Sequence, residues 1–117
     1  PARQMAPAEA GQIADMAALV ARTLELSVTA LVDDSTEAAK QVLVTDERID
    51  AYRDAVFDAA MVALGQGRAQ AQASVGRLFV ATALERIGDH ATNIAEEVLF
   101  VSRGIPPGAT RTGSDFG

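Results

Sequence analysis

The spacing of apolar residues between Arg68 and Gly104 leaves few choices of fold. Apolar residues in this segment recur at alternating steps of four and three, as residues on one face of a helix do: Val80, Leu84, Ile87, Ala91, Ile94, Val98 and Val101. We therefore expect one long helix that buries this seam. Gly104, with Pro106 and Pro107 just beyond it, predicts the end of the helix, and Arg103 lies favourably in its negatively polarised last turn.

Two earlier segments have the same helical periodicity. The first begins with Pro7 at the first helical position, and its apolar residues step by three and four: Ile13, Met16, Ala17, Val20, Leu24, Val28 and Leu31. The second extends from about Ser35 to Leu64, ends at the glycines of "GQG", and carries its own apolar face: Val42, Ile49, Tyr52, Val56, Ala59 and Ala63. Between the two, Asp34 is expected to cap the second helix, with Glu37 completing a capping box. Thr45 and Asp46 are a possible bend or restart within it.

Three long helices with short connectors predict an all-α fold, an antiparallel bundle of three helices over residues 1–104. The abundance of alanine and the shortage of aromatic residues, 4% of the chain, agree with closely packed helices. Residues 105–117 contain too few apolar side chains to fold and are expected to be a disordered tail. Further apolar residues exceed what so narrow a core needs, and we expect them to cover a second bundle or a second copy of the chain: Leu19, Leu26, Phe57, Met61 and Phe79.

The charge of the chain excludes several classes of partner. Its formal net charge is -6 and it contains no basic run, so nucleic acid is not an expected ligand. The absence of cysteine excludes disulfides and thiolate metal sites. No apolar stretch reaches the ~20 residues that cross a bilayer, and no signal peptide is visible, so we expect a soluble, cytoplasmic protein with at most peripheral contact with a membrane.

Acidic residues follow helical spacing on two of the expected helices. On the third helix, Glu85, Asp89, Thr92 and Glu96 form one line, which we expect to face solvent, away from the apolar seam. On the second helix, Asp46, Asp50 and Asp54 step by four and four. Like charges at this spacing repel each other, and Arg53 and Arg86 are the basic residues close enough to compensate. A cation bridging carboxylates one turn apart would convert the repulsion into binding, and hard oxygen ligands suit Mg, Ca, Mn and ferric iron, with Zn possible.

Simpler interpretations stand beside the metal site. An acidic line at helical spacing is usually a solvated helix face. The single histidine, His90, is interpreted first as a packed or rim residue, and Gly88 as a point where a neighbouring helix approaches closely. Catalytic patterns are absent: a di-iron Glu-x-x-His pair would need an acid at Ile87, and there is no nucleophile elbow, P-loop or dinucleotide fingerprint. We therefore expect no enzymatic activity.

The segment "LERIGDHATNIAE", Leu84 to Glu96, resembles the closing helix of PhoU proteins, regulators of bacterial phosphate uptake and signalling. "TDERIDAYRDAV", Thr45 to Val56, is similar to the family's second-helix pattern. The resemblance implies a metal site at Glu85, Asp89, Asp46 and Asp50, holding iron or zinc, with a multinuclear cluster possible and Mg or Ca less favoured. Asp54, Glu96 and His90 would be accessory ligands.

The resemblance also implies a non-catalytic regulator that contacts the ATPase of the phosphate ABC transporter and a sensor histidine kinase. PhoU proteins hold two bundles in tandem, whereas this chain has one, most similar to the second half. Three rivals remain: a purely structural or oligomerisation bundle, a metal-dependent enzyme built on the same four acids, and a PhoU-like regulator of another transporter.

Overall fold

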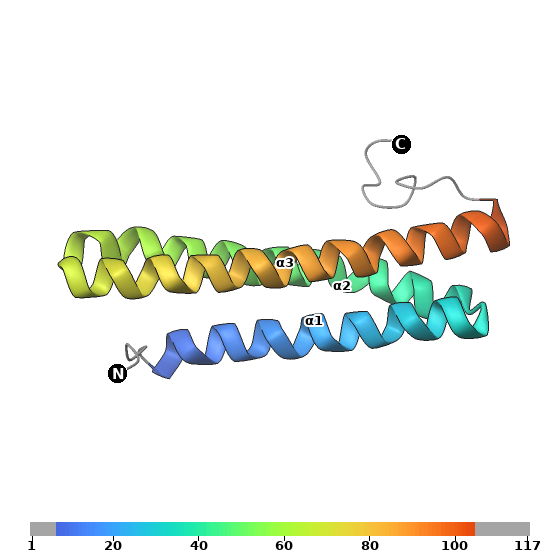
Figure 1. The fold of residues 1–117 in the computed structure, drawn as a ribbon, viewed down its shortest axis with the longest axis horizontal. Coiled ribbons are helices and arrows are strands. Elements are labelled where there is room, and N and C mark those ends of the chain that lie inside the picture. Colours follow the sequence, from blue (N-terminus) through green and yellow to red (C-terminus); the bar gives the residue numbers. More distant parts are fainter. Residues whose placement is uncertain (1–6, 105–117) are drawn as a thin grey trace.

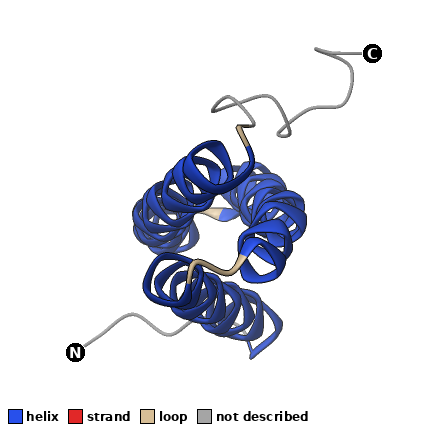
Figure 2. Ribbon diagram, turned by 90° about the vertical axis from the view of Figure 1, so that its right-hand side faces the viewer, coloured by secondary structure: helices blue, strands red, loops and turns tan. Residues whose placement is uncertain are grey.

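The computed structural model describes residues 7–104, and side chains from residue 11 onward. Three helices make up almost all of this part: α1 (Pro7–Asp33), α2 (Thr36–Ala63) and α3 (Arg68–Arg103), with a single 3-10 turn, η1 (Leu64–Gln66), between the last two. The three lie side by side, α2 antiparallel to α1 and α3, and surround a common axis (Figure 1, Figure 2). The predicted all-α three-helix bundle is confirmed. The expected tail, residues 105–117, and residues 1–6 of the expected bundle lie outside the described residues.

The helix boundaries agree with the sequence pattern except at the first connector. Asp34 has a left-handed backbone (φ 52) and ends α1, while Ser35 N–H donates to the Ala30 carbonyl at 3.0 Å. The same Ser35 is extended, and its Oγ accepts the Ala38 N–H at 3.1 Å, so Ser35 is the N-cap of α2. The predicted cap at Asp34 and the capping box with Glu37 are therefore wrong by one residue, because Asp34 is used to reverse the chain.

Helix α2 continues without interruption through Thr45, whose Oγ1 donates to the Val42 carbonyl at 2.8 Å. The bend or restart considered there does not occur. Helix α3 ends at Gly104 as predicted; this glycine is left-handed (φ 72) and its N–H donates to the Phe100 carbonyl at 2.9 Å.

The buried faces of α1 and α3 differ from the predicted seams. On α3, Ala91 and Val98 are buried as predicted, but Val80, Ile87 and Val101 are exposed, Val101 by 80%. The buried stripe also includes Leu99 and a line of small residues: Ser74, Ala81, Gly88, Thr92 and Ala95. On α1, Leu24, Val28 and Leu31 are exposed, whereas the line from Met16 and Val20 continues through Thr23, Ser27 and Ala30. Small side chains at these positions let the neighbouring backbones approach closely.

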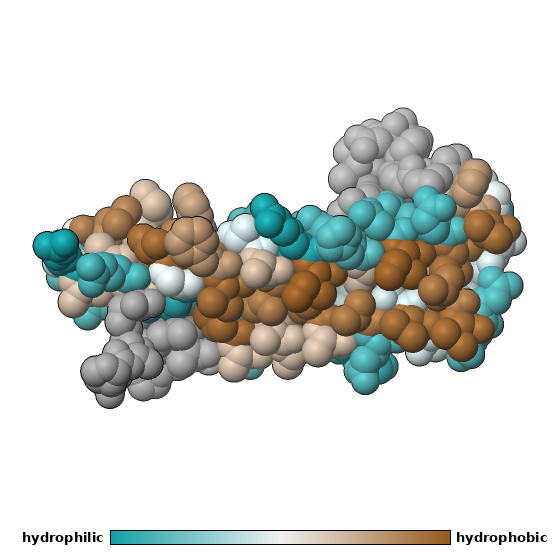
Figure 3. Space-filling view, viewed as in Figure 1, coloured by the Kyte–Doolittle hydropathy of each residue, from teal (hydrophilic) through white to brown (hydrophobic). Residues whose placement is uncertain are grey.

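The remaining predictions of buried and exposed residues are confirmed in part. On α2, Val42, Ile49, Val56 and Ala63 are buried as expected. Of the residues expected as surplus apolar surface, Leu26 is part of the core and Leu19 is partly buried against it, while Phe57, Met61 and Phe79 are exposed. Figure 3 shows apolar residues gathered over α1 and α3 on the face viewed. We call the exposed apolar residues of these two stripes the α1/α3 apolar face: Leu24, Val28 and Leu31 on α1, with Val80, Ile87 and Val101 on α3.

Candidate functional site

The four predicted ligands lie along the line where α2 and α3 face each other. Two contacts fix the register: Thr92 Oγ1 of α3 donates to Asp46 Oδ1 at 3.1 Å, and Arg53 of α2 forms an ion pair with Glu85 of α3. Because the helices are antiparallel, moving from Asp46 to Arg53 on α2 matches moving from Thr92 back to Glu85 on α3. Asp50 and Asp89 fall between these two contacts, and each of the four acids is half-buried. We call this group the acid cluster.

The predicted outward orientation of the acidic line on α3 is wrong. Thr92 and Glu96 are buried, at 0% and 5% exposure, and the Glu85 side chain is only 19% exposed. The cause is the shift of the core stripe: with Gly88, Thr92 and Ala95 at the bundle centre, the acids lie at its border with α2 instead of opposite it.

Gly88 lets α2 come close beside the acid cluster. A Cβ built at this position would lie 3.0 Å from Ile49 Cδ1, and Ile49 is itself 1% exposed. The predicted packing role of Gly88 is therefore confirmed. The close approach also brings Asp46 and Asp50, which flank Ile49 on α2, toward the acids of α3.

Burial and repulsion by neighbouring acids shift Asp50 and Glu85 toward their neutral forms, because both raise the pKa of these two side chains. Burial is the main cause that raises the pKa of Asp50, and the nearby Asp46 raises it further. Burial also raises the pKa of Glu85, with Asp50 and Asp89 adding to it. The Arg53 guanidinium opposes both shifts, since a neighbouring positive charge favours ionised carboxylates.

Arg53 connects the acid cluster to the exposed Asp54. Its Nη1 donates to Glu85, and its Nη2 and Nε donate to Asp54 Oδ1 at 3.0 and 3.3 Å. The hydrogen bond to Asp54 is the main cause that raises the pKa of Arg53, which therefore stays charged. The expectation that Arg53 compensates the negative charge of the acids is confirmed. Its partner in the acid cluster is Glu85, on the neighbouring helix α3.

The donor chemistry of the acid cluster fits a hard or borderline cation, since all four groups are carboxylates. Their present arrangement is that of paired acids: over residues 11–104, no three side chains of histidine, aspartate or glutamate come close enough together to hold one ion. Glu85 is engaged by Arg53 and Asp46 by Thr92. Of the accessory candidates, His90 and Asp54 are exposed and Glu96 is buried.

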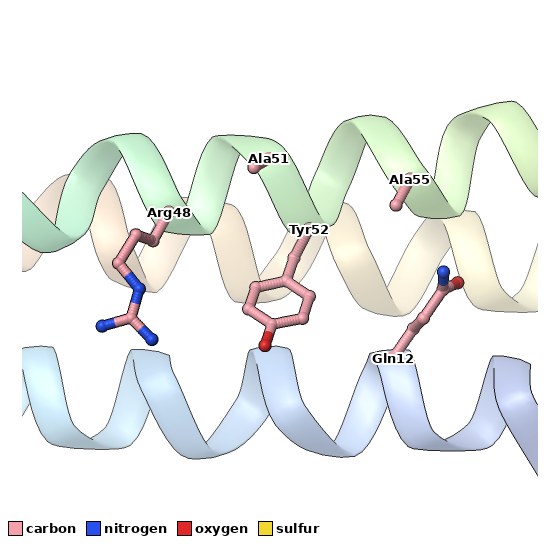
Figure 4. A pocket seen from close by; sticks show the side chains of 5 residues that line it. All are labelled: Gln12, Arg48, Ala51, Tyr52 and Ala55. Atoms are coloured by element: carbon pink, nitrogen blue, oxygen red, sulfur yellow. The ribbon is translucent and has the colours of Figure 1, made fainter.

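A separate groove lies between α1 and α2. Arg48 and Tyr52 extend from α2 toward α1, and Gln12 extends from α1 toward α2, with Ala51 and Ala55 completing the lining (Figure 4). None of the four acids lines it, so this groove is distinct from the acid cluster.

What sequence reasoning missed at the site is the depth of the α3 acids and the pairing of Arg53 with Glu85. The available signal was the line of small residues Ala81, Gly88, Thr92 and Ala95, which marks the side of α3 that meets its neighbours. The pairing across helices had no such signal, because it depends on the register of α2 against α3.

Comparison with known proteins agrees with the resemblance. The family model described as "PhoU domain" matches residues 13–98, which include all four acids. A "Phosphate-specific transport system accessory protein PhoU homolog" of Xylella fastidiosa (strain 9a5c) is 36% identical over 92 residues, 76% of this chain and 39% of the relative. Similarly named proteins of Rhizobium meliloti and Thermotoga maritima are 34% and 25% identical, over 70% and 80% of this chain.

The chain spans about two fifths of the length of these relatives, 39%, 35% and 40% respectively. No solved structure matches the chain. Among residues 7–104, no helix combines the length and the apolar character that crossing a membrane requires.

Proposed function

Because the chain belongs to the PhoU family, we propose that it is an accessory regulator of phosphate transport that acts through protein contacts and without catalysis. The observation that carries this proposal is the family match over residues 13–98, together with relatives whose names place them in the phosphate-specific transport system. In this proposal the protein works in the cytoplasm and contacts the ATPase of a phosphate ABC transporter and the sensor histidine kinase of the phosphate-starvation response.

The proposal includes a metal site at the acid cluster, with Glu85 and Asp89 of α3 and Asp46 and Asp50 of α2 as ligands, and iron or zinc as the metal. Two findings support it. The four carboxylates lie on facing helices, and the pKa values of Asp50 and Glu85 are raised partly by the neighbouring acids, so a cation there would relieve repulsion. Bound metal would fix α2 against α3 and present a charged surface for protein contacts.

Elemental analysis tests the metal site. The wild type is purified without chelator, reconstituted with iron or zinc, and compared with the Glu85→Gln, Asp89→Asn double variant. The matched control is Asp15→Asn with Glu25→Gln, which removes the same two charges from exposed positions on α1. We expect metal in the wild type and the control and its loss from a double variant that circular dichroism shows to be helical. Equal metal content in all three, or none in any, would make the acid cluster a purely structural feature.

The partner contacts are tested separately, by copurification with the ATPase subunit of a phosphate transporter. Binding to the ATPase of a different transporter would favour the alternative in which this PhoU-like bundle regulates another system. If neither ATPase binds and no metal is found, the structural or oligomerisation bundle is the better interpretation.

We also propose that the α1/α3 apolar face packs on a second three-helix bundle, provided by a second copy of the chain or by a tandem bundle of the same protein. Large apolar side chains at both stripes of this face support it, because contiguous exposed apolar surface on this scale usually marks a contact with another protein. The acid cluster lies on the α2 side of α3, so both surfaces can be used at once.

A further inference from the structure

Helices α2 and α3 form an apolar groove beside the acid cluster, on the side toward η1. The groove has a volume of about 390 Å³ and is lined by residues of both helices: Arg53, Asp54, Phe57, Leu78, Ala81 and Thr82. Arg53 is also the residue that pairs with Glu85, so the groove begins where the acid cluster ends. We call this site the α2/α3 groove.

One line of side chains on each helix changes from apolar to acidic along this border. On α3 the line steps by three and four through Val75, Leu78, Thr82, Glu85 and Asp89. On α2 the matching line contains Met61, Phe57, Asp54, Asp50 and Asp46. Because the two helices are antiparallel, both lines place their apolar residues at the η1 end and their acids at the other end.

The bundle itself does not explain the exposed apolar end. Phe57 and Met61 are 51% and 53% exposed, whereas Val56, Ala60 and Ala63 supply the buried side of the same part of α2. Large apolar side chains left in solvent beside a groove usually mark a contact with another molecule. A groove between two helices is also the kind of surface on which an amphipathic helix docks, with anchoring residues one turn apart.

The charges beside the α2/α3 groove decide which molecule fits it. The five carboxylates of the two lines outnumber the neighbouring Arg53 and Arg86. A nucleic acid or an anionic membrane would place negative charge against these acids. A second copy of the chain, with a net charge of -6 and no basic run, would add further acids. A partner helix that is apolar at one end and basic at the other complements both ends of the surface.

We propose that the α2/α3 groove, continued by the acid cluster, binds one amphipathic helix of a partner protein. The partner's apolar side chains lie against Phe57 and Leu78, and its Lys or Arg side chains lie against the acids. The inference rests on the proposed regulation through protein contacts and needs no metal. From Asp46 to Met61 the surface extends over about 22 Å of α2, which fits a partner helix of about four turns.

The test uses a synthetic, fluorescently labelled peptide of about four helical turns, with leucine on one face of its first half and lysine on the same face of its second half. Fluorescence anisotropy measures its binding to metal-free protein. Phe57→Ser with Met61→Ser changes the apolar end, and we expect about tenfold weaker binding. Asp50→Asn with Asp54→Asn changes the acidic end, and we expect about fivefold weaker binding that becomes less dependent on salt.

Each pair has a matched control. Val44→Ser with Val62→Ser alters two valines of α2 that are 69% and 65% exposed and do not line the groove. Asp15→Asn with Glu25→Gln removes two charges from exposed positions on α1. Both control variants should bind the peptide as the wild type does, and circular dichroism should show every variant to be helical. A peptide with glutamate in place of lysine should lose binding to the wild type.

Equal weakening by the groove variants and their controls would mean diffuse attraction and would overturn the docking site, as would a wild type that does not bind the peptide. Copurification with the transporter ATPase that survives Phe57→Ser with Met61→Ser would also overturn it, while leaving the proposed regulation standing. A wild type that binds the peptide but neither the ATPase nor the sensor kinase would overturn the proposed partners and leave the groove as a helix-docking site.

Discussion

At the residue scale, the acid cluster is defined by partial burial more than by the number of its charges. Acids along an exposed helix line would each keep their water, and their repulsion would be small. Here Thr92 and Gly88 lie at the bundle centre beside them, so Glu85 loses most of its contact with solvent. Desolvation is accordingly the largest cause of the raised pKa at both Asp50 and Glu85. The ionised forms of Asp50 and Glu85 are therefore less stable than those of acids along an exposed helix line would be.

This burial predicts a pH-dependent effect of Asp50→Asn. The folded pKa of Asp50 is raised above its usual 3.8, so the stability linked to its protonation is present below that value and is lost as pH rises through the folded pKa. Removing the charge should therefore stabilise the protein at pH 7 relative to the wild type, and the gain should shrink as the pH is lowered toward the usual value. Urea unfolding of metal-free protein at both pH values measures this; a gain that grows at acid pH would contradict the assigned shift.

At the element scale, α1 and α3 each have two apolar sides, and small residues make up much of the side that the bundle buries. On α3 the buried side carries Ala81, Gly88 and Ala95, and the large residues Val80 and Val101 remain outside. Close contact of backbones increases the number of packed atoms per helix turn, and it is possible only where side chains are short. Gly88 and Ile49 are the sharpest instance, with the glycine accommodating the isoleucine.

The contact predicts a coupled effect of Gly88→Ala and Ile49→Val. Alanine favours the helix by about 1 kcal/mol, but overpacking against buried Ile49 costs 1–3 kcal/mol in typical cores, so we expect a net loss of about 1 kcal/mol. Ile49→Val alone should cost about 1 kcal/mol, yet it removes the methyl that lies 3.0 Å from the new Cβ. The double variant should then lose clearly less than the sum of the two single losses, as measured by chemical denaturation.

Gly11→Ala is the matched control, because Gly11 is also helical and a Cβ there meets nothing within 4 Å. It should stabilise the protein by up to about 1 kcal/mol. Stabilisation of similar size by Gly88→Ala would show that Ile49 moves aside freely.

At the scale of the whole molecule, α3 has a polar border on one side, with α2, and an apolar border on the other side, with α1. The border with α2 holds the acid cluster and Arg53, and the border with α1 presents the α1/α3 apolar face (Figure 3). A bundle of 52 × 31 × 17 Å has little interior, so it cannot bury these large side chains within itself. In the proposed function, this division would let another bundle cover one surface while the other stays accessible to metal and partner proteins.

The apolar face predicts self-association of the chain. We expect light scattering after size-exclusion chromatography to give a mass above that of the monomer, 12.2 kDa, and Val28→Asp with Ile87→Asp to shift it to the monomer with the helical circular dichroism unchanged. The control is Phe57→Asp with Met61→Asp, which places the same charges on exposed apolar residues of α2. A monomeric wild type, or dissociation by the control pair alone, would mean that copies of the chain do not meet through this face.

The sequence by itself determined the three helices, the ends at Gly104 and near Gly65, the acid spacing on α2 and α3, and the family resemblance, because these depend on local periodicity and short-range backbone preferences. Only the tertiary structure decided which apolar stripe of α1 and α3 is buried, that Ser35 and not Asp34 caps α2, and that Arg53 pairs with Glu85. When a helix has two apolar sides, the choice between them depends on how closely neighbouring backbones can approach. That distance is set by side chains from other helices, such as Ile49 against Gly88, which no pattern within one helix contains.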